Sequence, residues 1–119
     1  MISVVLPIRL VSVANIREHW AKRAKRTKEQ RNLADLALRR MTHEVWNGRE
    51  LRTFAVTITR IAPRGLDGDN LQSACKGLRD GIADAMLVDD GDPRITWNYR
   101  QSSGRPKQYA VLIEIEVSH

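Results

Sequence analysis

The sequence predicts a single α/β (α+β) domain over residues 1–119, with a mixed sheet of about four strands and two main helices in the order β-α-β-α-β-β. Three observations support this prediction. A chain of 119 residues has the length of one domain. Segments rich in β-branched residues alternate with segments whose apolar residues recur at helical spacing. The composition, 42% hydrophobic and 29% charged, is typical of a globular protein rather than a disordered chain.

The first half of the chain predicts a strand followed by a long helix. Residues 2–11 are mostly aliphatic and β-branched, which favours a strand. Asn15 begins a capping-box pattern, so we expect a helix to start there and to continue to about Trp46. The dipeptide at 47–48, Asn-Gly, should end it. The apolar stripe of this helix consists of Leu33, Leu36, Ala37, Met41 and Val45.

The second half predicts three strands and one more helix. Residues 52–61 alternate between apolar and polar types, which is typical of a strand. Residues 70–86 have helical periodicity. Residues 94–100 and 108–117 are expected to form two further strands, joined by a turn at 102–106.

The charge of the chain is unevenly distributed. The formal net charge is +6 and the sequence pI is about 10.1, which suggests an anionic partner such as nucleic acid, although a solvated positive face is the simpler explanation. Residues 1–52 hold 12 basic and 5 acidic side chains, a net +7. Residues 67–92 hold seven aspartates and two basic residues, a net −5. The sequence therefore combines a basic region with an acidic one.

A helix over 70–86 would carry two distinct faces. With a step of about 100° per residue, one polar stripe would contain Asp69, Ser73, Lys76 and Asp80. Cys75 would lie on the opposite, apolar face and act as a small buried residue rather than a nucleophile. The simpler interpretation of the stripe is a solvated surface with a Lys76–Asp80 pair, and that of Asp69 is a helix N-cap.

The aspartates that flank this helix are candidate metal ligands. Mg²⁺ prefers carboxylate oxygens and keeps several waters. Asp67 and Asp69 could direct two carboxylates at one ion, with a third from the segment around Asp89, Asp90 and Asp92. A basic protein with a carboxylate-bound cation suggests phosphodiester cleavage. The single cysteine excludes an intramolecular disulfide, and the chain shows no zinc-site spacing and no phosphate-binding loop.

These residues resemble a known family. The pattern of residues 67–71 (Asp-Gly-Asp-Asn-Leu), then Lys76, then residues 87–90 (Leu-Val-Asp-Asp) is similar to that of the RusA-like Holliday-junction resolvases, crossover junction endodeoxyribonucleases of bacteria and prophages, in their phage-type branch. The resemblance covers nearly the whole chain. It implies a RusA-like fold and a small homodimeric endonuclease that depends on Mg²⁺, or Mn²⁺ in its place. Such an enzyme cuts four-way DNA junctions by paired nicks in recombination and repair.

The resemblance also implies roles for individual residues. Asp67, Asp69 and Asp90 match the metal-binding aspartates of the family, and Asp89 matches an accessory acid. The catalytic lysine corresponds to Lys76, although the best-known family pattern places a lysine where this chain has Ser73. The basic residues expected to contact DNA phosphates by their charge are Arg17, Lys22, Arg23, Lys25 and Arg26.

Two other functions remain open at this stage. The chain could be a module that binds branched nucleic acid without cutting it, or a metal-dependent nuclease with another structural specificity. No signal peptide and no membrane-spanning run of about 18–20 apolar residues is recognisable, so we expect a cytoplasmic protein with no membrane partner.

Overall fold

A computed structural model describes residues 1–11, 20–45 and 52–118 of the chain. They form an α+β unit with a mixed four-stranded sheet, as the sequence predicts. The elements are β1 (Ile2–Leu6), α1 (Trp20–Val45), β2 (Thr53–Ala62), α2 (Gly68–Ala74), α3 (Lys76–Ala85), β3 (Ile95–Ser103) and β4 (Ala110–Ser118). The predicted order is confirmed, except that two consecutive helices, α2 and α3, replace the second predicted helix.

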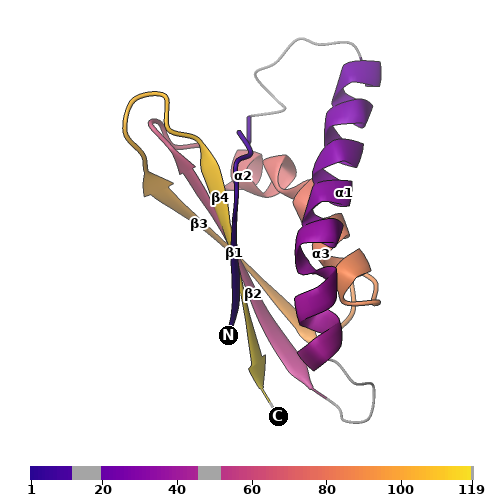
Figure 1. Cartoon of the computed structure of the whole chain (residues 1–119). Helices are drawn as coiled ribbons and strands as arrows, with labels where there is room; N and C mark the ends of the chain where they lie inside the picture. The colour runs from indigo at the N-terminus through magenta and orange to yellow at the C-terminus, as the bar shows by residue number, and fades with distance from the viewer. Residues whose placement is uncertain (12–19, 46–51, 119) are drawn as a thin grey trace.

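The sheet has the strand order β1-β4-β2-β3. β4 pairs antiparallel with both β1 and β2, whereas β2 and β3 are parallel. Parallel neighbours require a crossover connection, and α2 and α3 provide it. Figure 1 shows α1 and α3 side by side on one face of the sheet, with α2 near one end of the strands. The two acidic segments of the sequence therefore flank the crossover.

One face of the central strand β2 is buried under the helices. Every second residue of this strand is inaccessible, in agreement with the predicted alternation. Arg60 belongs to this buried row and is only 7% exposed. The row consists of Phe54, Val56, Ile58, Arg60 and Ala62.

The helices α1 and α3 approach each other closely at two glycines. A Cβ on Gly77 would lie 2.7 Å from the carbonyl oxygen of Thr27, and one on Gly81 would lie 2.9 Å from Cβ of Ala34. Both distances are shorter than real Cβ atoms tolerate. Because residues four apart share a face of a helix, the two glycines form one contact surface on α3.

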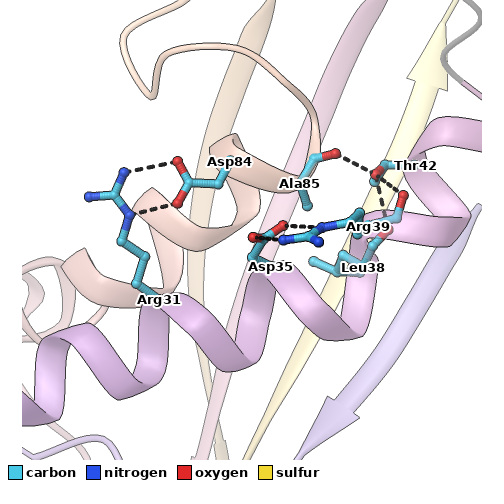
Figure 2. A network of polar contacts seen from close by, with 7 residues as sticks. All are labelled: Arg31, Asp35, Leu38, Arg39, Thr42, Asp84 and Ala85. Carbon is cyan, nitrogen blue, oxygen red and sulfur yellow. Dashed lines mark hydrogen bonds and ion pairs between the residues drawn. The ribbon is translucent and has the colours of Figure 1, made fainter.

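Polar side chains hold the same two helices together further along, as Figure 2 shows. Arg31 donates two hydrogen bonds to the carboxylate of Asp84, at 2.6 and 2.9 Å. The buried hydroxyl of Thr42 lies 2.8 Å from the carbonyl oxygen of Ala85, at the last residue of α3. These contacts fix the point at which the chain leaves α3 for the second acidic segment.

The first strand is shorter than the sequence predicts. The strand predicted over 2–11 ends at Leu6, because Pro7 has no N–H to continue the ladder. The predicted cap at Asn15 and the stop at residues 47–48 lie outside the described residues.

The single helix predicted over 70–86 is wrong. The structure begins it two residues earlier, at Gly68, and breaks it at Cys75. The backbone of Cys75 has φ −88° and ψ −2°, away from regular helical values, and its N–H faces the carbonyl oxygens of both Leu71 and Gln72. The polar stripe predicted from one continuous helix is therefore divided between two helices.

Candidate functional site

The first acidic segment lies where β2 leads into α2. Asp67 occupies the N-cap position in an extended conformation, but its carboxylate makes no capping hydrogen bond and instead accepts one from Asn70 at 3.3 Å. Asp69 lies in the first helical turn and is exposed. The interpretation of Asp69 as the N-cap is therefore wrong, since Asp67 holds that position. Neither carboxylate is used to cap the helix, and both face solvent.

The chain that delivers Asp67 is anchored by Arg60. Its guanidinium donates to the carbonyl oxygens of Leu10, at 3.0 Å, and of Arg64, at 2.6 Å. Burial lowers the pKa of the Arg60 guanidinium, and the electrostatic interaction with Tyr109 opposes this shift. The hydrogen bonds to carbonyl oxygens satisfy a charged group that is otherwise enclosed. Arg60 thus joins the segments after β1 and after β2.

Gln101 anchors the same segment from the neighbouring strand. Its side-chain amide exchanges two hydrogen bonds with the main chain of Leu66, the residue directly before Asp67. Neither Arg60 nor Gln101 was identified from the sequence as important for the site. The sequence signal for Arg60 is its position as a charged residue on the apolar face of an alternating strand.

The second acidic segment is held against α3 and β3. The main-chain oxygen of Asp90 accepts hydrogen bonds from Arg79, at 3.2 Å, and from the indole of Trp97, at 2.8 Å. The same guanidinium donates to the hydroxyl of Tyr99 at 3.0 Å and lies 4.8 Å from the centre of a Trp97 ring. The side chain of Asp90 is 45% exposed. Asp90 therefore has a fixed backbone and an accessible carboxylate.

The predicted lysine lies at the start of α3. Lys76 is exposed, and its ammonium lies 3.8 Å from a carboxylate oxygen of Asp80, which is the i,i+4 pair of the simpler interpretation. Ser73 is exposed on α2, on the other side of the break at Cys75.

Asp90 has acidic neighbours that the sequence did not connect with it. A hollow of about 170 Å³ lies between the second acidic segment and the α1–α3 pair. Its lining comprises Arg31, Asp80, Ala83, Asp84, Val88, Asp89 and Asp90. Asp89, the predicted accessory acid, is exposed.

The three predicted metal ligands are not assembled as a set. Within residues 1–11, 20–45 and 52–118, no three His, Cys, Asp or Glu side chains lie close enough to hold an ion together. Asp67 and Asp69 are exposed carboxylates two residues apart at the start of α2, the ligand type that Mg²⁺ prefers.

The predicted DNA-binding residues lie mainly on α1. Lys22, Arg23, Lys25 and Arg26 occupy its first two turns, whereas Arg17 is outside the described residues. Lys25 forms an exposed pair with Glu29 at 4.0 Å.

A groove of about 800 Å³ joins this basic helix to α3. Of the basic residues predicted to bind DNA, Arg23 lines it, and Lys28 and Arg31 are further basic residues of α1 in the lining. The full lining is Trp20, Arg23, Ala24, Thr27, Lys28, Arg31, Asn32, Lys76 and Asp80. The groove thus places basic side chains of α1 beside Lys76.

Comparison with known proteins gives one informative similarity. No family model matches the chain. An uncharacterised protein of Xylella fastidiosa (strain Temecula1 / ATCC 700964) is 36% identical over 84 residues. The match includes 64% of this chain but only 51% of the relative, so the chain spans about half the length of that protein. Among the described helices, none has the length and apolar character needed to cross a membrane.

Proposed function

We propose that this chain is a Mg²⁺-dependent endonuclease, similar to the RusA-like resolvases, that cuts four-way DNA junctions by paired nicks. One observation carries the proposal. The carboxylates of Asp67 and Asp69 are exposed and do not cap the helix that they begin, and the same crossover ends in a loop that presents the accessible carboxylate of Asp90.

The side chains have distinct roles in this proposal. Asp67 and Asp69 bind the cation, which activates water and stabilises charge on the phosphorus oxygens. Lys76 is 72% exposed and near the basic groove, so its ammonium can contact a phosphate and stabilise negative charge there. Arg23 and Lys28 contact the DNA backbone, which fixes its position without reading sequence.

The oligomeric state and setting belong to the same proposal. A four-way junction offers two equivalent cutting points, which a twofold symmetric homodimer matches. An enzyme that acts on chromosomal or prophage DNA in recombination and repair works in the cytoplasm of a bacterium.

A second function is favoured by a specific observation. Asp90 is paired with Arg79, and the three predicted ligands are not brought together within the described residues. A protein that binds branched nucleic acid without cutting it would need the basic groove but not the assembled acids. A nuclease with a different structural specificity would need both.

Cleavage of a synthetic four-way junction, with Mg²⁺ and with a chelator, tests the proposal. We expect cutting only with the metal. Loss of a residue that only supports a metal ligand costs roughly 10- to 100-fold. Asp67→Asn and Asp69→Asn remove proposed ligands themselves, so each should reduce the cleavage rate by more than this. Asp35→Asn is the matched control, because Asp35 pairs with Arg39 on α1. Its rate should be that of the wild type.

The alternatives give different results in the same assay. Salt-sensitive junction binding without products would support the binding module. Faster cutting of flaps or single strands in a substrate panel would indicate another nuclease specificity. Cutting in the presence of the chelator, or cutting that survives Asp67→Asn, would contradict the assignment of the metal site.

A further inference from the structure

We propose that Arg79 is a positioning residue that, together with Trp97, holds the main chain of Asp90 and leaves its carboxylate available to the reaction centre. This inference rests on the proposed function. It assigns a role to a cation that lies on α3, 11 residues before Asp90 in the chain.

Two side chains donate hydrogen bonds to the main chain of Asp90. Arg79 and Trp97 both donate to the main-chain oxygen of Asp90, at 3.2 and 2.8 Å. The guanidinium also donates to Tyr99 at 3.0 Å. Trp97 and Tyr99 are on β3, so the contacts join α3, β3 and the loop that carries Asp90. The hydrogen bonds that hold the loop go to the backbone of Asp90, while its side chain is in an ion pair with Arg79.

The carboxylate of Asp90 accepts no aligned hydrogen bond from Nε of Arg79. Nε of Arg79 lies 3.2 Å from Oδ2 of Asp90, but it is not aligned to donate a hydrogen bond to it. The Asp90 side chain is 45% exposed. A carboxylate with a nearby positive charge and no bidentate partner is available to accept another ligand.

Asp92, in the same loop, shows the contrasting arrangement. Both of its carboxylate oxygens accept hydrogen bonds from Arg94, at 3.0 and 2.8 Å, and Oδ1 also accepts from the main-chain N–H of Arg94. An aspartate engaged in this way has a structural role in the turn. The loop therefore contains two different aspartates. The carboxylate of Asp92 is hydrogen-bonded to Arg94, whereas the hydrogen bonds at Asp90 go to its main-chain oxygen.

The contacts of Arg79 require an arginine rather than a lysine. An arginine presents donors in a rigid planar fork, which lets one side chain reach both Tyr99 and the carbonyl oxygen of Asp90 while stacking on Trp97. A lysine has a single ammonium and cannot reproduce this geometry. Arg79→Lys therefore preserves the charge and removes the positioning.

The experiment compares Arg79→Lys and Trp97→Phe with the wild type and with Arg100→Lys. Arg100 is an exposed arginine on β3, so it is the matched control. The first measurement is the exchange rate of the Trp97 indole proton by NMR, which reports the hydrogen bond to Asp90. The second is the Mg²⁺ concentration that half-saturates junction cleavage, with junction binding measured in parallel.

We expect Arg79→Lys to accelerate indole exchange by about 10-fold or more, since the loop loses one of its two anchors. In Arg79→Lys and in Trp97→Phe, the half-saturating Mg²⁺ concentration should rise, or the maximal rate should fall, by about 10- to 100-fold, with junction binding unchanged. Arg100→Lys should match the wild type in both measurements. A merely structural role would lower thermal stability without changing the Mg²⁺ dependence.

Two results would overturn the inference. One is unchanged indole exchange in Arg79→Lys, and the other is unchanged Mg²⁺ dependence in a folded, cleaving Arg79→Lys. If the wild type cuts no junction, the proposed function fails. In that case the inference is tested by indole exchange and by the broadening of the Asp90 amide NMR signal on addition of Mn²⁺. The inference is overturned unless Arg79→Lys changes both measurements.

Discussion

The side-chain amide of Gln101 on β3 is hydrogen-bonded to both main-chain groups of Leu66, at 2.6 and 2.7 Å, across 35 residues of sequence. Leu66 directly precedes Asp67, and Arg60 binds the carbonyl oxygen of Arg64 two residues before it. The turn that carries the first acidic segment is therefore attached to two strands of the sheet. Its geometry depends on side chains distant from it in sequence.

We expect Gln101→Ala to affect activity more than stability. The variant loses two hydrogen bonds to Leu66, which are near the surface, and a long one of 3.5 Å from Arg60, so the free energy of unfolding should fall by only about 1 kcal/mol. Displacement of Asp67 should reduce junction cleavage by about 10- to 100-fold, as small misplacements of reacting groups do. Urea unfolding and cleavage rates check the two effects. Gln108→Ala, which removes a contact in the turn between β3 and β4, should leave cleavage unchanged. Equal losses of activity in the two variants would refute the role of Gln101.

The contact between Gly81 and α1 predicts a strongly destabilising substitution. In Gly81→Ala the new methyl group would overlap the carbonyl oxygen of Arg31 and lie 2.9 Å from Cβ of Ala34. Alanine favours a helix over glycine by about 0.5–1 kcal/mol. Overpacking against backbone costs about 1–3 kcal/mol and should outweigh this gain. We expect a net loss of about 2 kcal/mol in the free energy of unfolding, measured by urea denaturation. Gly91→Ala is the control, because a Cβ there meets no atom within 4 Å. A stabilised Gly81→Ala would show that the helices do not approach so closely.

The order of the elements was predictable because it depends on local patterns. The alternation in residues 53–62 comes from burial of one face of the strand against the core. The stripe predicted for the long helix is partly wrong, because Leu33 and Leu36 are exposed whereas Ala34 and Leu38 lie in the core. The break at Cys75 was not predictable in the same way. The residues on either side have helical periodicity, and the change of direction is visible only in the backbone of Cys75 itself.

The site was predictable in its residue types but not in its supports. Two aspartates separated by one residue before a helix are visible in sequence, and so is a pair of aspartates after it. Arg79 and Gln101 act through the pairing of β3 with its neighbours and through the packing of α3, which place them beside residues distant in sequence. No local spacing indicates such contacts. The stripe predicted to contain both Asp69 and Lys76 is divided between α2 and α3 by the break at Cys75.

The buried thiol of Cys75 predicts chemical inertness in the folded protein. The side chain is fully enclosed, and this burial raises the pKa of the thiol to about 12, although the Arg60 charge opposes the effect. Because the thiolate is the reactive form, the native protein should not react with Ellman's reagent at about pH 8. The unfolded protein should release one equivalent of thionitrobenzoate, since the chain has one cysteine. Rapid labelling of the native protein would mean that the core around Cys75 opens readily.

The Asp92–Arg94 pair predicts a loss of stability in acid. Hydrogen bonds from Arg94 lower the pKa of the Asp92 carboxyl to about 2, whereas the unfolded chain has a value of about 3.9. A group whose pKa is lower in the folded state contributes stability above the unfolded value, and this contribution disappears as the pH falls through the folded value. The free energy of unfolding should therefore decrease between about pH 4 and pH 2. Asp92→Asn should be less stable than the wild type at pH 7, and the difference should vanish near pH 2. Some acid sensitivity will remain in this variant, because the hydrogen bond from Arg31 also lowers the pKa of Asp84. Urea unfolding followed by tryptophan fluorescence across this range measures both proteins, and a difference independent of pH would contradict the assignment.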